Sequence, residues 1–334
     1  MVLRELPDSD RGGEREAREG NSTMDESYLV TGGAGFIGPH LVDALLARGK
    51  RVRVLDNLST GRRENLSHVS GEVELIEGDL RSYERVYTAA VGCDVVLHLG
   101  ALPSVPRSIQ DPLTTNAVNV TGTLNVLLAS RDAGVRRAVL ASSSSVYGPT
   151  QTLPKTESMQ TCPASPYGVS NLAAEQYFVA CNGVYSMEAV ALRLFNVFGP
   201  RQDPTSQYSA VIPLFVQAAL LGTRPTIFGD GTQSRDFTYV ANVVDAFQRA
   251  ATAEGAAGQV MNVACGERRT LNDLIDQVGQ AVGATLEPLY AAPRIGDIAH
   301  SFADITKTRS VLGYAPLVSF GDGIAKTVAW MRER

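Results

Sequence analysis

Short apolar segments alternate with amphipathic helical segments along the first part of the chain. The candidate strands span residues 28–30, 51–56, 73–76, 94–99, 137–142 and 188–192, and a helix is predicted at 116–132, before Ala133-Gly134. This alternation predicts a parallel sheet with helices on both faces, and ligands bind such sheets at the carboxyl ends of the strands. The sequence therefore predicts an α/β fold, a Rossmann-type doubly wound parallel sheet.

The second half of the chain is less regular. Helices are predicted at 210–221, 241–251, 271–282 and 319–332, with a turn-rich stretch at 229–233. We expect a dinucleotide-binding domain at 26–193 that also receives 235–263, and a smaller C-terminal α/β substrate-binding domain at 194–334. Residues 1–25 mix charged residues with glycine and serine and have no long apolar stretch, which predicts a disordered tail.

Composition narrows the class of protein. Apolar residues make up 44 % of the chain and charged residues 19 %, which is typical of a globular protein with a large core. A net charge of −5 without a basic stripe argues against a nucleic-acid partner, and no apolar run is long enough to cross a bilayer. The cysteines and histidines show no metal-ligand spacing, so we expect reduced thiols in a cytoplasmic protein and no metal.

A glycine-rich turn, TGGAGFIG (31–38), follows the first predicted strand. Gly32, Gly35 and Gly38 remove side chains where the backbone must approach a pyrophosphate, and the next helix directs its free N–H groups at that anion. The second strand ends at Asp56. An acidic side chain there accepts hydrogen bonds from an adenosine ribose and repels a 2′-phosphate, so the sequence favours NAD over NADP.

Two further features bear on the same cofactor. Arg62 and Arg63 keep NADP as an alternative, unless they are only solvated loop charges. Asp79 follows the third strand, where its carboxylate can either reach the adenine amino group of a dinucleotide or cap the next helix. His40 and His98 are interpreted as structural residues.

Hydroxyl side chains gather near the end of the fifth predicted strand. The segment ASSSSVYG (141–148) puts four serines at the carboxyl edge of the sheet, although one or two of them can serve only the loop backbone. Further on, PYGVSNLAAEQY (166–177) puts Tyr167 at the start of a helix that faces the same edge. The sequence therefore predicts hydroxyl groups and a phenol at one edge of the sheet.

The chain resembles the extended short-chain dehydrogenase/reductase family, and within it the nucleotide-sugar 4-epimerases, in its glycine turn, Asp56, Asp79, serine segment and Tyr167 helix. The similarity extends over about residues 27–332 and includes RLFNVFGPRQ (193–202), YSAVIP (208–213), FGDGTQSRDFTYV (228–240) and PRIGDIAHSFADITKTRSVLGY (293–314). It implies NAD as the cofactor, a UDP-sugar as the substrate, and a homodimer built from the helices that begin near Asn116 and Tyr167.

The resemblance also implies a mechanism. Tyr167 as a phenolate takes the proton of the sugar 4-hydroxyl, Ser143 hydrogen-bonds to that oxygen, and the C4 hydride passes to the nicotinamide and returns to the other face of a 4-keto sugar. The implied cofactor contacts are Gly32, Gly35, Phe36, Ile37, Gly38, Asp56, Asn57, Asp79, Leu80, Leu99, Ala101, Asn116 and Tyr167. The implied substrate contacts, in which two arginines match two phosphate charges, are Ser104, Ser143, Ser144, Asn196, Phe228, Arg235, Arg294, Asp297 and Ser301.

One position departs from the family pattern. A lysine is expected one helical turn after Tyr167, and this chain has Asn171 there. The lysine holds the nicotinamide ribose, and its charge lowers the pKa of the tyrosine; asparagine can keep the hydrogen bond but supplies no charge. We therefore expect slow turnover with binding largely kept. The alternative of another class is an NAD- or nucleotide-sugar-binding protein without turnover.

Three enzyme activities share this scaffold. A 4,6-dehydratase needs an acid and a base where this chain has Ser144 and Ser145, and a UDP-glucuronate decarboxylase needs further cationic groups for the sugar carboxylate, which the sequence does not reveal. A 4-epimerase needs only hydride and proton transfer. Ser301 stands where glucose-restricted relatives carry a bulky tyrosine. Room there for a 2-N-acetyl group favours UDP-GlcNAc and UDP-GalNAc over UDP-glucose.

Overall fold

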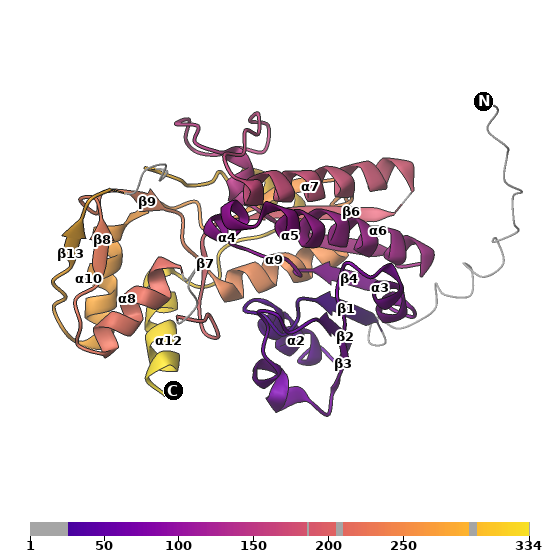
Figure 1. Cartoon of the computed structure of the whole chain (residues 1–334), viewed down its shortest axis with the longest axis horizontal. Helices are drawn as coiled ribbons and strands as arrows, with labels where there is room; N and C mark the ends of the chain where they lie inside the picture. Colours follow the sequence, from indigo (N-terminus) through magenta and orange to yellow (C-terminus); the bar gives the residue numbers. More distant parts are fainter. Residues whose placement is uncertain (1–25, 186, 205–209, 294–298, 334) are drawn as a thin grey trace, which may run out of the picture.

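A seven-stranded parallel sheet forms the centre of the fold in the computed structural model, which describes residues 26–185, 187–204, 210–293 and 299–333 (Figure 1). The predicted tail at 1–25 lies outside the described residues. The strand order is β11-β6-β5-β4-β1-β2-β3. The strands are β1 (Ser27–Thr31), β2 (Arg51–Asp56), β3 (Val73–Glu77), β4 (Val95–His98), β5 (Arg137–Ser143), β6 (Glu188–Leu194) and β11 (Val260–Val263). The order reverses between β1 and β4, as in a Rossmann sheet, so the predicted fold class is confirmed.

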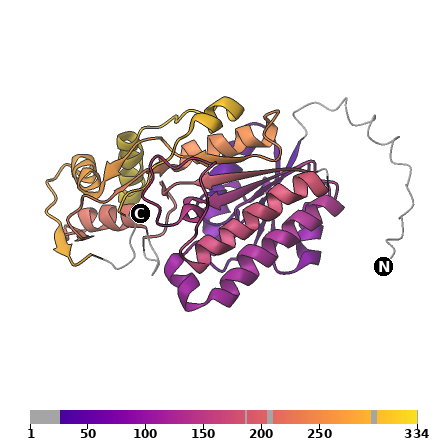
Figure 2. The same ribbon diagram turned by 90° about the horizontal axis from the view of Figure 1, so that it is seen from above.

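Helices cover both faces of the sheet, and Figure 2 shows α6 and α7 on one side of the strands and α9 on the other. The first face carries α3 (Tyr83–Ala90), α6 (Gly122–Asp132) and α7 (Pro166–Val184), and the second carries α2 (Gly38–Leu46), α9 (Val240–Thr252) and α11 (Thr306–Leu312). Each face has its own apolar cluster. Leu127 and Phe178 belong to the first cluster, and Leu41 and Phe247 to the second. Burial of these side chains holds the helices against the two faces of the sheet.

The helix predicted at 116–132 begins earlier than expected and is interrupted. It starts as α5 (Pro112–Asn116), where the Asp111 carboxylate caps the first turn, and it passes through a π-helical turn (Ala117–Thr121) into α6. A π turn inserts an extra residue into the helix, so the side chains that follow face other directions than a regular α-helix predicts. Asn119 lies inside this π turn.

A smaller set of elements forms the C-terminal lobe on the left of Figure 1. Its strands pair two by two, β7 with β10, β8 with β13 and β9 with β12. The elements are β7 (Val197–Phe198), α8 (Val211–Leu220), β8 (Thr226–Phe228), β9 (Ser234–Arg235), β10 (Thr238–Tyr239), β12 (Arg269–Thr270), α10 (Leu271–Val282), β13 (Leu289–Ala291) and α12 (Phe320–Arg332). Between these elements the chain returns to the large sheet through α9 and β11. The domain boundaries given above stay a prediction.

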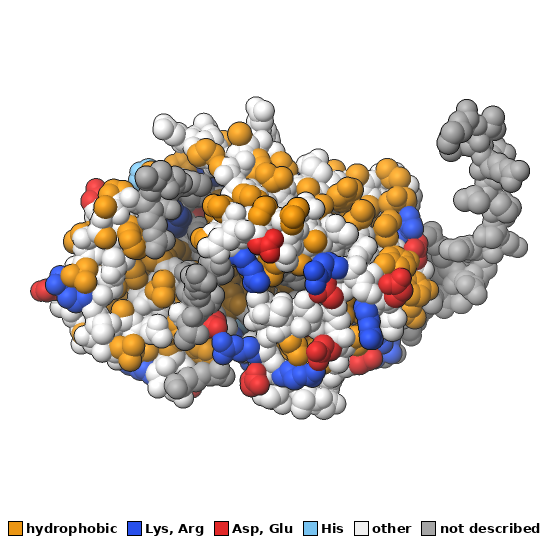
Figure 3. All heavy atoms as spheres, in the orientation of Figure 1, with side chains coloured by type: hydrophobic (Ala, Val, Ile, Leu, Met, Phe, Trp, Pro, Cys, Tyr) orange, Lys and Arg blue, Asp and Glu red, His pale blue; other side chains and the backbone are white. Residues whose placement is uncertain are grey.

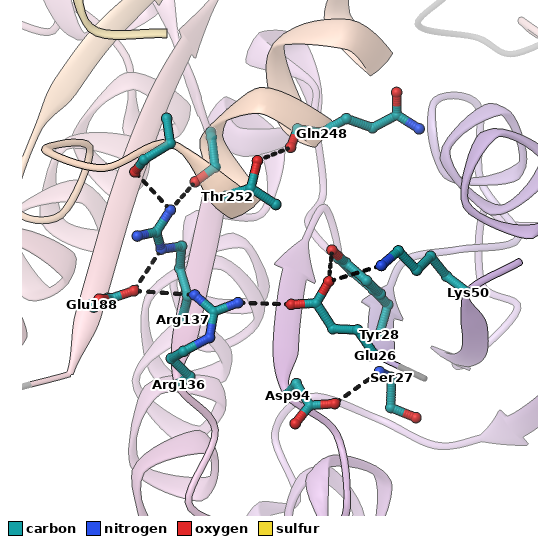
Figure 4. Close-up of polar contacts among 12 residues, drawn as sticks. Glu26, Ser27, Tyr28, Lys50, Asp94, Arg136, Arg137, Glu188, Gln248 and Thr252 are labelled. Atoms are coloured by element: carbon teal, nitrogen blue, oxygen red, sulfur yellow. Dashed lines mark hydrogen bonds and ion pairs between the residues drawn. The ribbon is translucent and has the colours of Figure 1, made fainter. Parts of the chain in front are cut away.

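The amino ends of the strands are tied together by charged groups (Figure 4). The Glu26 carboxylate, just before β1, accepts a hydrogen bond of 2.7 Å from Arg136 beside β5. Arg137 donates at 2.7 Å to Glu188 on β6, and at 3.0 Å to the carbonyl of Ala250 on α9. Because these contacts join three strands and a helix at this end, the opposite, carboxyl end is the one open to ligands.

Apolar side chains gather on the outer surface of α4 (Val105–Gln110), α5 and α7, as Figure 3 shows across the upper part of the molecule. Leu113 is 83 % exposed and Ile109 65 % exposed. The five residues that we call the α4–α7 patch are Val105, Ile109, Leu113, Val169 and Tyr177. An exposed group of this kind is typical of an interaction surface.

Candidate active site

The glycine turn after β1 is packed so closely that side chains cannot be added at Gly32 or Gly38. Gly32 has a φ of +68°, and a Cβ there would lie 2.7 Å from the backbone of Gly100. A Cβ on Gly38, where α2 begins, would lie 2.5 Å from the Cα of Gly33. A Cβ on Gly35 would have only the carbonyl oxygen of Gly32 nearby, at 3.2 Å, so the turn is more open on that side. This arrangement fits a pyrophosphate at the N-terminus of α2.

Asp56, at the end of β2, is buried and accepts hydrogen bonds from two backbone N–H groups. Burial raises the pKa of its carboxyl, and the two hydrogen bonds lower it only in part. The arginines that kept NADP open both contact carboxylates, Arg62 with Asp203 at 2.6 Å and Arg63 with Glu77. A buried acid beside engaged arginines fits a ribose hydroxyl better than a 2′-phosphate, which favours NAD.

The predicted adenosine contacts Asn57 and Asp79 lie next to each other. Asp79 accepts a hydrogen bond of 3.0 Å from the Asn57 amide and two from the guanidinium of Arg81, at 2.8 and 2.9 Å. The hydrogen bonds from Arg81 hold the pKa of Asp79 well below its usual range. Helix α3 is capped by Ser82. The alternative interpretation of Asp79 as the helix cap is therefore wrong.

A narrow cavity lies between β4, β5, α6 and α7, at the carboxyl edge of the sheet. Its lining includes Leu99, Ala101 and Asn171, which the sequence predicted as site residues, and also His98, Gly100, Asn119, Thr123, Leu140, Ala141, Ser170 and Ala174, which it did not. The cavity is adjacent to the glycine turn, because the Gly32 and Gly100 backbones touch. The cavity has a volume of only about 10 Å³, room for one water, and it marks the end of β4 beside the glycine turn, the region where Rossmann sheets bind their ligands.

Asn119 is one of the polar residues of this cavity that the sequence interpretation missed. Its side chain accepts a hydrogen bond of 2.8 Å from the Leu102 N–H and donates one of 3.1 Å to the Ser170 hydroxyl. Asn116, which was predicted as a cofactor contact, lies exposed at the end of α5 and is not among the lining residues. Asn119 lies inside the π turn and is buried, as are Thr115 and Thr123, four residues before and after it. The cofactor contact of Asn116 stays a prediction, and the structure adds Asn119 as a candidate beside it.

Tyr167 and Ser143 lie next to the cavity, because Tyr167 contacts both Ser143 and Asn171, and Asn171 is one of the lining residues. Tyr167 lies in the first turn of α7, and its N–H donates to the Ser108 hydroxyl at 3.0 Å. The phenol of Tyr167 hydrogen-bonds with Ser143 and Asn171. Asn171 also donates to the carbonyl of Tyr167 at 2.8 Å, so its amide folds back on its own helix. The three residues that the sequence predicted as catalytic are thus neighbours in the structure, and their catalytic roles stay predictions.

The environment of Tyr167 favours the neutral phenol. Burial raises the pKa of Tyr167 above its ordinary value, and the hydrogen bonds with Ser143 and Asn171 lower it only in part. Asn171 is itself buried and carries no charge. The groups that touch this phenol therefore orient it but do not supply the positive charge that would stabilise a phenolate.

Three predicted substrate contacts lie close together in the C-terminal lobe. The Asn196 amide donates to the carbonyl of Asp236 at 3.0 Å, next to Arg235 on β9. Asn196 itself has a φ of +35°, which is uncommon for a residue other than glycine. The N–H of Ser301 donates to the carbonyl of Ser234 at 3.0 Å, beside the same arginine. Asn196, Arg235 and Ser301 therefore come from three chain segments that meet at residues 234–236.

The remaining predicted substrate contacts come from several elements. Ser104 caps α4, Ser144 begins the 3₁₀ turn (Ser144–Tyr147) after β5, and Phe228 ends β8. Arg294 and Asp297 lie outside the described residues.

His98 is held by two hydroxyl groups, and the described residues contain no group suited to a metal ion. His98 contacts the hydroxyls of Thr31 and Thr123, at 2.6 and 2.9 Å, and burial lowers its pKa to about 4. Within the described ranges, no group of three or more His, Cys, Asp or Glu side chains is arranged to hold a metal ion. In the same part of the chain, no helix is both long and apolar enough to cross a membrane.

Comparison with known proteins agrees with this geometry. Residues 28–264 match the model of the NAD dependent epimerase/dehydratase family. A UDP-glucose 4-epimerase of Mycolicibacterium smegmatis is 42 % identical over 310 residues, covering 92 % of this chain and 98 % of the relative. A structure of a UDP-N-acetylglucosamine 4-epimerase from Methanobrevibacter ruminantium, in complex with UDP-N-acetylmuramic acid, is 38 % identical with a TM-score of 0.88, covering 92 % and 99 %. A Thermus thermophilus UDP-glucose 4-epimerase in complex with NAD is 37 % identical with a TM-score of 0.83, at the same coverage.

Proposed function

The chain belongs to the NAD dependent epimerase/dehydratase family, and from this membership we propose that it is an NAD-dependent epimerase acting at C4 of a UDP-hexose. UDP-GlcNAc and UDP-GalNAc are the proposed substrate pair. The observation that carries the proposal is the contact of Tyr167 with Ser143 beside a cavity that joins the glycine turn. A base and a hydroxyl next to a dinucleotide are what a reversible oxidation at C4 requires.

The proposed chemistry needs few groups from the chain. NAD, when bound, would supply a group that can take up a hydride from C4 and return it to the opposite face. Tyr167 removes the proton of the 4-hydroxyl and gives it back after the 4-keto sugar has rotated in the site. Because the hydride also returns to C4, the reaction has no net redox change. Ser143 orients the hydroxyl oxygen, while Asn196 and Arg235 bind the diphosphate. Ser144 and Ser145, where a dehydratase needs an acid and a base, are hydroxyls that do not serve that purpose.

The proposal is tested by incubating the protein with UDP-GlcNAc and, separately, with UDP-glucose. We expect slow conversion of UDP-GlcNAc to UDP-GalNAc, because the small Ser301 side chain beside Arg235 leaves room for a 2-N-acetyl group. Chromatography of the nucleotide sugars measures both conversions. Strict preference for UDP-glucose would remove the argument from Ser301, and loss of water or carbon dioxide from a UDP-sugar would favour the dehydratase or decarboxylase alternative.

A Ser301→Tyr variant gives the matched control for this substrate choice. We expect it to lose on the order of tenfold or more in kcat/KM for UDP-GlcNAc, because steric exclusion of a small group is worth about 1–3 kcal/mol. Activity on UDP-glucose should stay near that of the parent. Equal losses on both sugars would mean that Ser301 supports the fold and does not select the substrate.

We further propose that the protein is a homodimer formed through the α4–α7 patch. The support is the exposure of large apolar side chains on three adjacent helices, which a second copy can bury about a twofold axis. Helix α7, and α5 where the helix expected near Asn116 begins, belong to the helices from which the family resemblance builds a dimer; α4 adds to them. This proposal concerns assembly and does not depend on which UDP-sugar is bound.

A double variant, Ile109→Asp with Leu113→Asp, is expected to be monomeric. Two carboxylates buried without partners at the interface would each cost several kcal/mol, far more than an exposed leucine contributes elsewhere. Light scattering after size-exclusion chromatography measures the mass of parent and variant. Leu317→Asp, at a leucine that is 63 % exposed outside the patch, is the control and should leave the dimer intact. A monomeric parent, or a dimeric double variant, would contradict the proposed interface.

A further inference from the structure

The carboxylate of Glu175 connects two strands to helix α7 behind the site. Glu175 has no exposed surface and accepts a hydrogen bond of 2.9 Å from the hydroxyl of Ser142 on β5. It also accepts two hydrogen bonds from the guanidinium of Arg193 on β6, from Nε at 2.9 Å and from Nη2 at 2.6 Å. Ser142 is 3 % exposed and Arg193 is 4 % exposed. Three elements therefore meet at one buried carboxylate.

Glu175 is connected to Tyr167 along helix α7, and through Ser142 to Ser143 on strand β5. Glu175 is on the same helix as Tyr167, two turns or about 12 Å further along the axis. Its partner Ser142 directly precedes Ser143 in β5. A shift of α7 along β5 would change the separation between the Ser143 hydroxyl and the Tyr167 phenol. The contact between Glu175 and Ser142 opposes such a shift.

The ion pair makes this connection rigid. A two-point contact between a guanidinium and a carboxylate fixes both their distance and their relative orientation. A buried pair adds little net stability, because each charge loses its hydration, but it strongly disfavours arrangements in which the partners separate. Arg193 is further held by its guanidinium carbon, which lies 4.7 Å from the centre of the Tyr147 ring. The geometry of Glu175 is therefore set from β6 and transmitted to β5 through Ser142.

On the basis of the proposed function, we propose that Glu175, held by Arg193 and bonded to Ser142, is a positioning residue that sets the contact between Ser143 and Tyr167. Glu175 does not touch the substrate or the cofactor in this account. It acts only through the relative placement of β5 and α7, and misplacement of reacting groups by a fraction of an ångström is enough to slow a reaction.

The experiment removes the Ser142 hydroxyl and leaves the ion pair intact. Glu175→Gln would leave Arg193 buried without its counter-charge and risks unfolding, so Ser142→Ala is the informative variant. Its matched control is Ser130→Ala on α6, because Ser130 is equally buried and its hydroxyl has no hydrogen-bond partner among the described residues. Both variants are compared with the parent in thermal stability, bound NAD, kcat and KM.

We expect Ser142→Ala to lower kcat on the order of tenfold, with KM, bound NAD and thermal stability close to those of Ser130→Ala. The phenol of Tyr167 should also ionise at a higher pH by several tenths of a unit, because its hydrogen bond with Ser143 lowers its pKa and that bond becomes weaker. Equal kcat in the two alanine variants, with equal phenol ionisation, would overturn the proposal.

The phenol measurement separates this proposal from the proposed function. Tyrosinate absorbance, taken as the difference between a protein and its Tyr167→Phe counterpart, reports the ionisation without any sugar present. If the parent does not convert UDP-sugars but Ser142→Ala still shifts the titration, the proposed function fails and the positioning role stands. If the parent is active and neither kcat nor the titration responds to Ser142→Ala, the positioning role fails and the proposed function stands.

Discussion

Replacement of Asn171 by lysine is expected to raise kcat on the order of 100-fold near neutral pH, with bound NAD unchanged. A unit positive charge at about 4 Å in an effective dielectric of about 20 is worth on the order of 4 kcal/mol, which corresponds to roughly three pKa units. Only part of that shift appears in the rate, because a weaker base also accepts a proton less readily. Turnover is measured on the UDP-sugar that the parent converts, together with the NAD content of each protein.

The pH dependence of the same two proteins gives a second measurement. Burial raises the pKa of Tyr167 in the parent, so the fraction present as phenolate, and with it kcat, should rise with pH through the neutral and mildly alkaline range. The lysine lowers that pKa, so the rate of the variant should level off at a lower pH. Asn171→Met, which has a long side chain without charge and loses the hydrogen bond to the phenol, is the control and should be no faster than the parent. A lysine variant that holds NAD and turns over no faster than the parent would contradict the electrostatic account.

The sequence could predict the large sheet because its strands are short, largely apolar segments that alternate with helical segments. The segment 51–56 coincides with β2, and the helix predicted at 271–282 coincides with α10. The glycine turn, Tyr167 and Ser143 could be found because each is defined by residues that are close in the chain. Such local patterns can be identified without knowing which distant residues they contact.

The features that the sequence could not predict depend on contacts between distant residues or on irregular backbone. The π turn that contains Asn119 carries no periodic signal, since five residues do not establish a new period. Arg62 pairs with Asp203, which is far along the chain, and Arg63 pairs with Glu77 at the end of strand β3. The two-residue strands of the C-terminal lobe form only through pairing with segments elsewhere in the lobe, so no single stretch encodes them.

Replacement of Tyr167 by phenylalanine is expected to lower kcat on the order of a thousandfold or more, the largest effect of any single substitution considered for this chain. The change removes one oxygen and keeps the ring that packs at the start of α7. Loss of the hydrogen bonds with Ser143 and Asn171 should cost only about 1 kcal/mol of stability. Bound NAD and affinity for the UDP-sugar should therefore persist while conversion stops.

Tyr314→Phe is the matched control for this loss. Tyr314 is 1 % exposed, and its hydroxyl donates to the carbonyl of Ala264 at 2.9 Å, so the substitution also removes one buried hydroxyl but far from any proposed catalytic contact. We expect a small decrease in thermal stability and an unchanged kcat. If the parent converts UDP-sugars and Tyr167→Phe retains that rate, the phenol is not the base. If the parent binds NAD and UDP-sugar without converting them, and Asn171→Lys does not restore conversion, the chain is a binding protein, because the charge missing beside the phenol is then not what prevents the reaction.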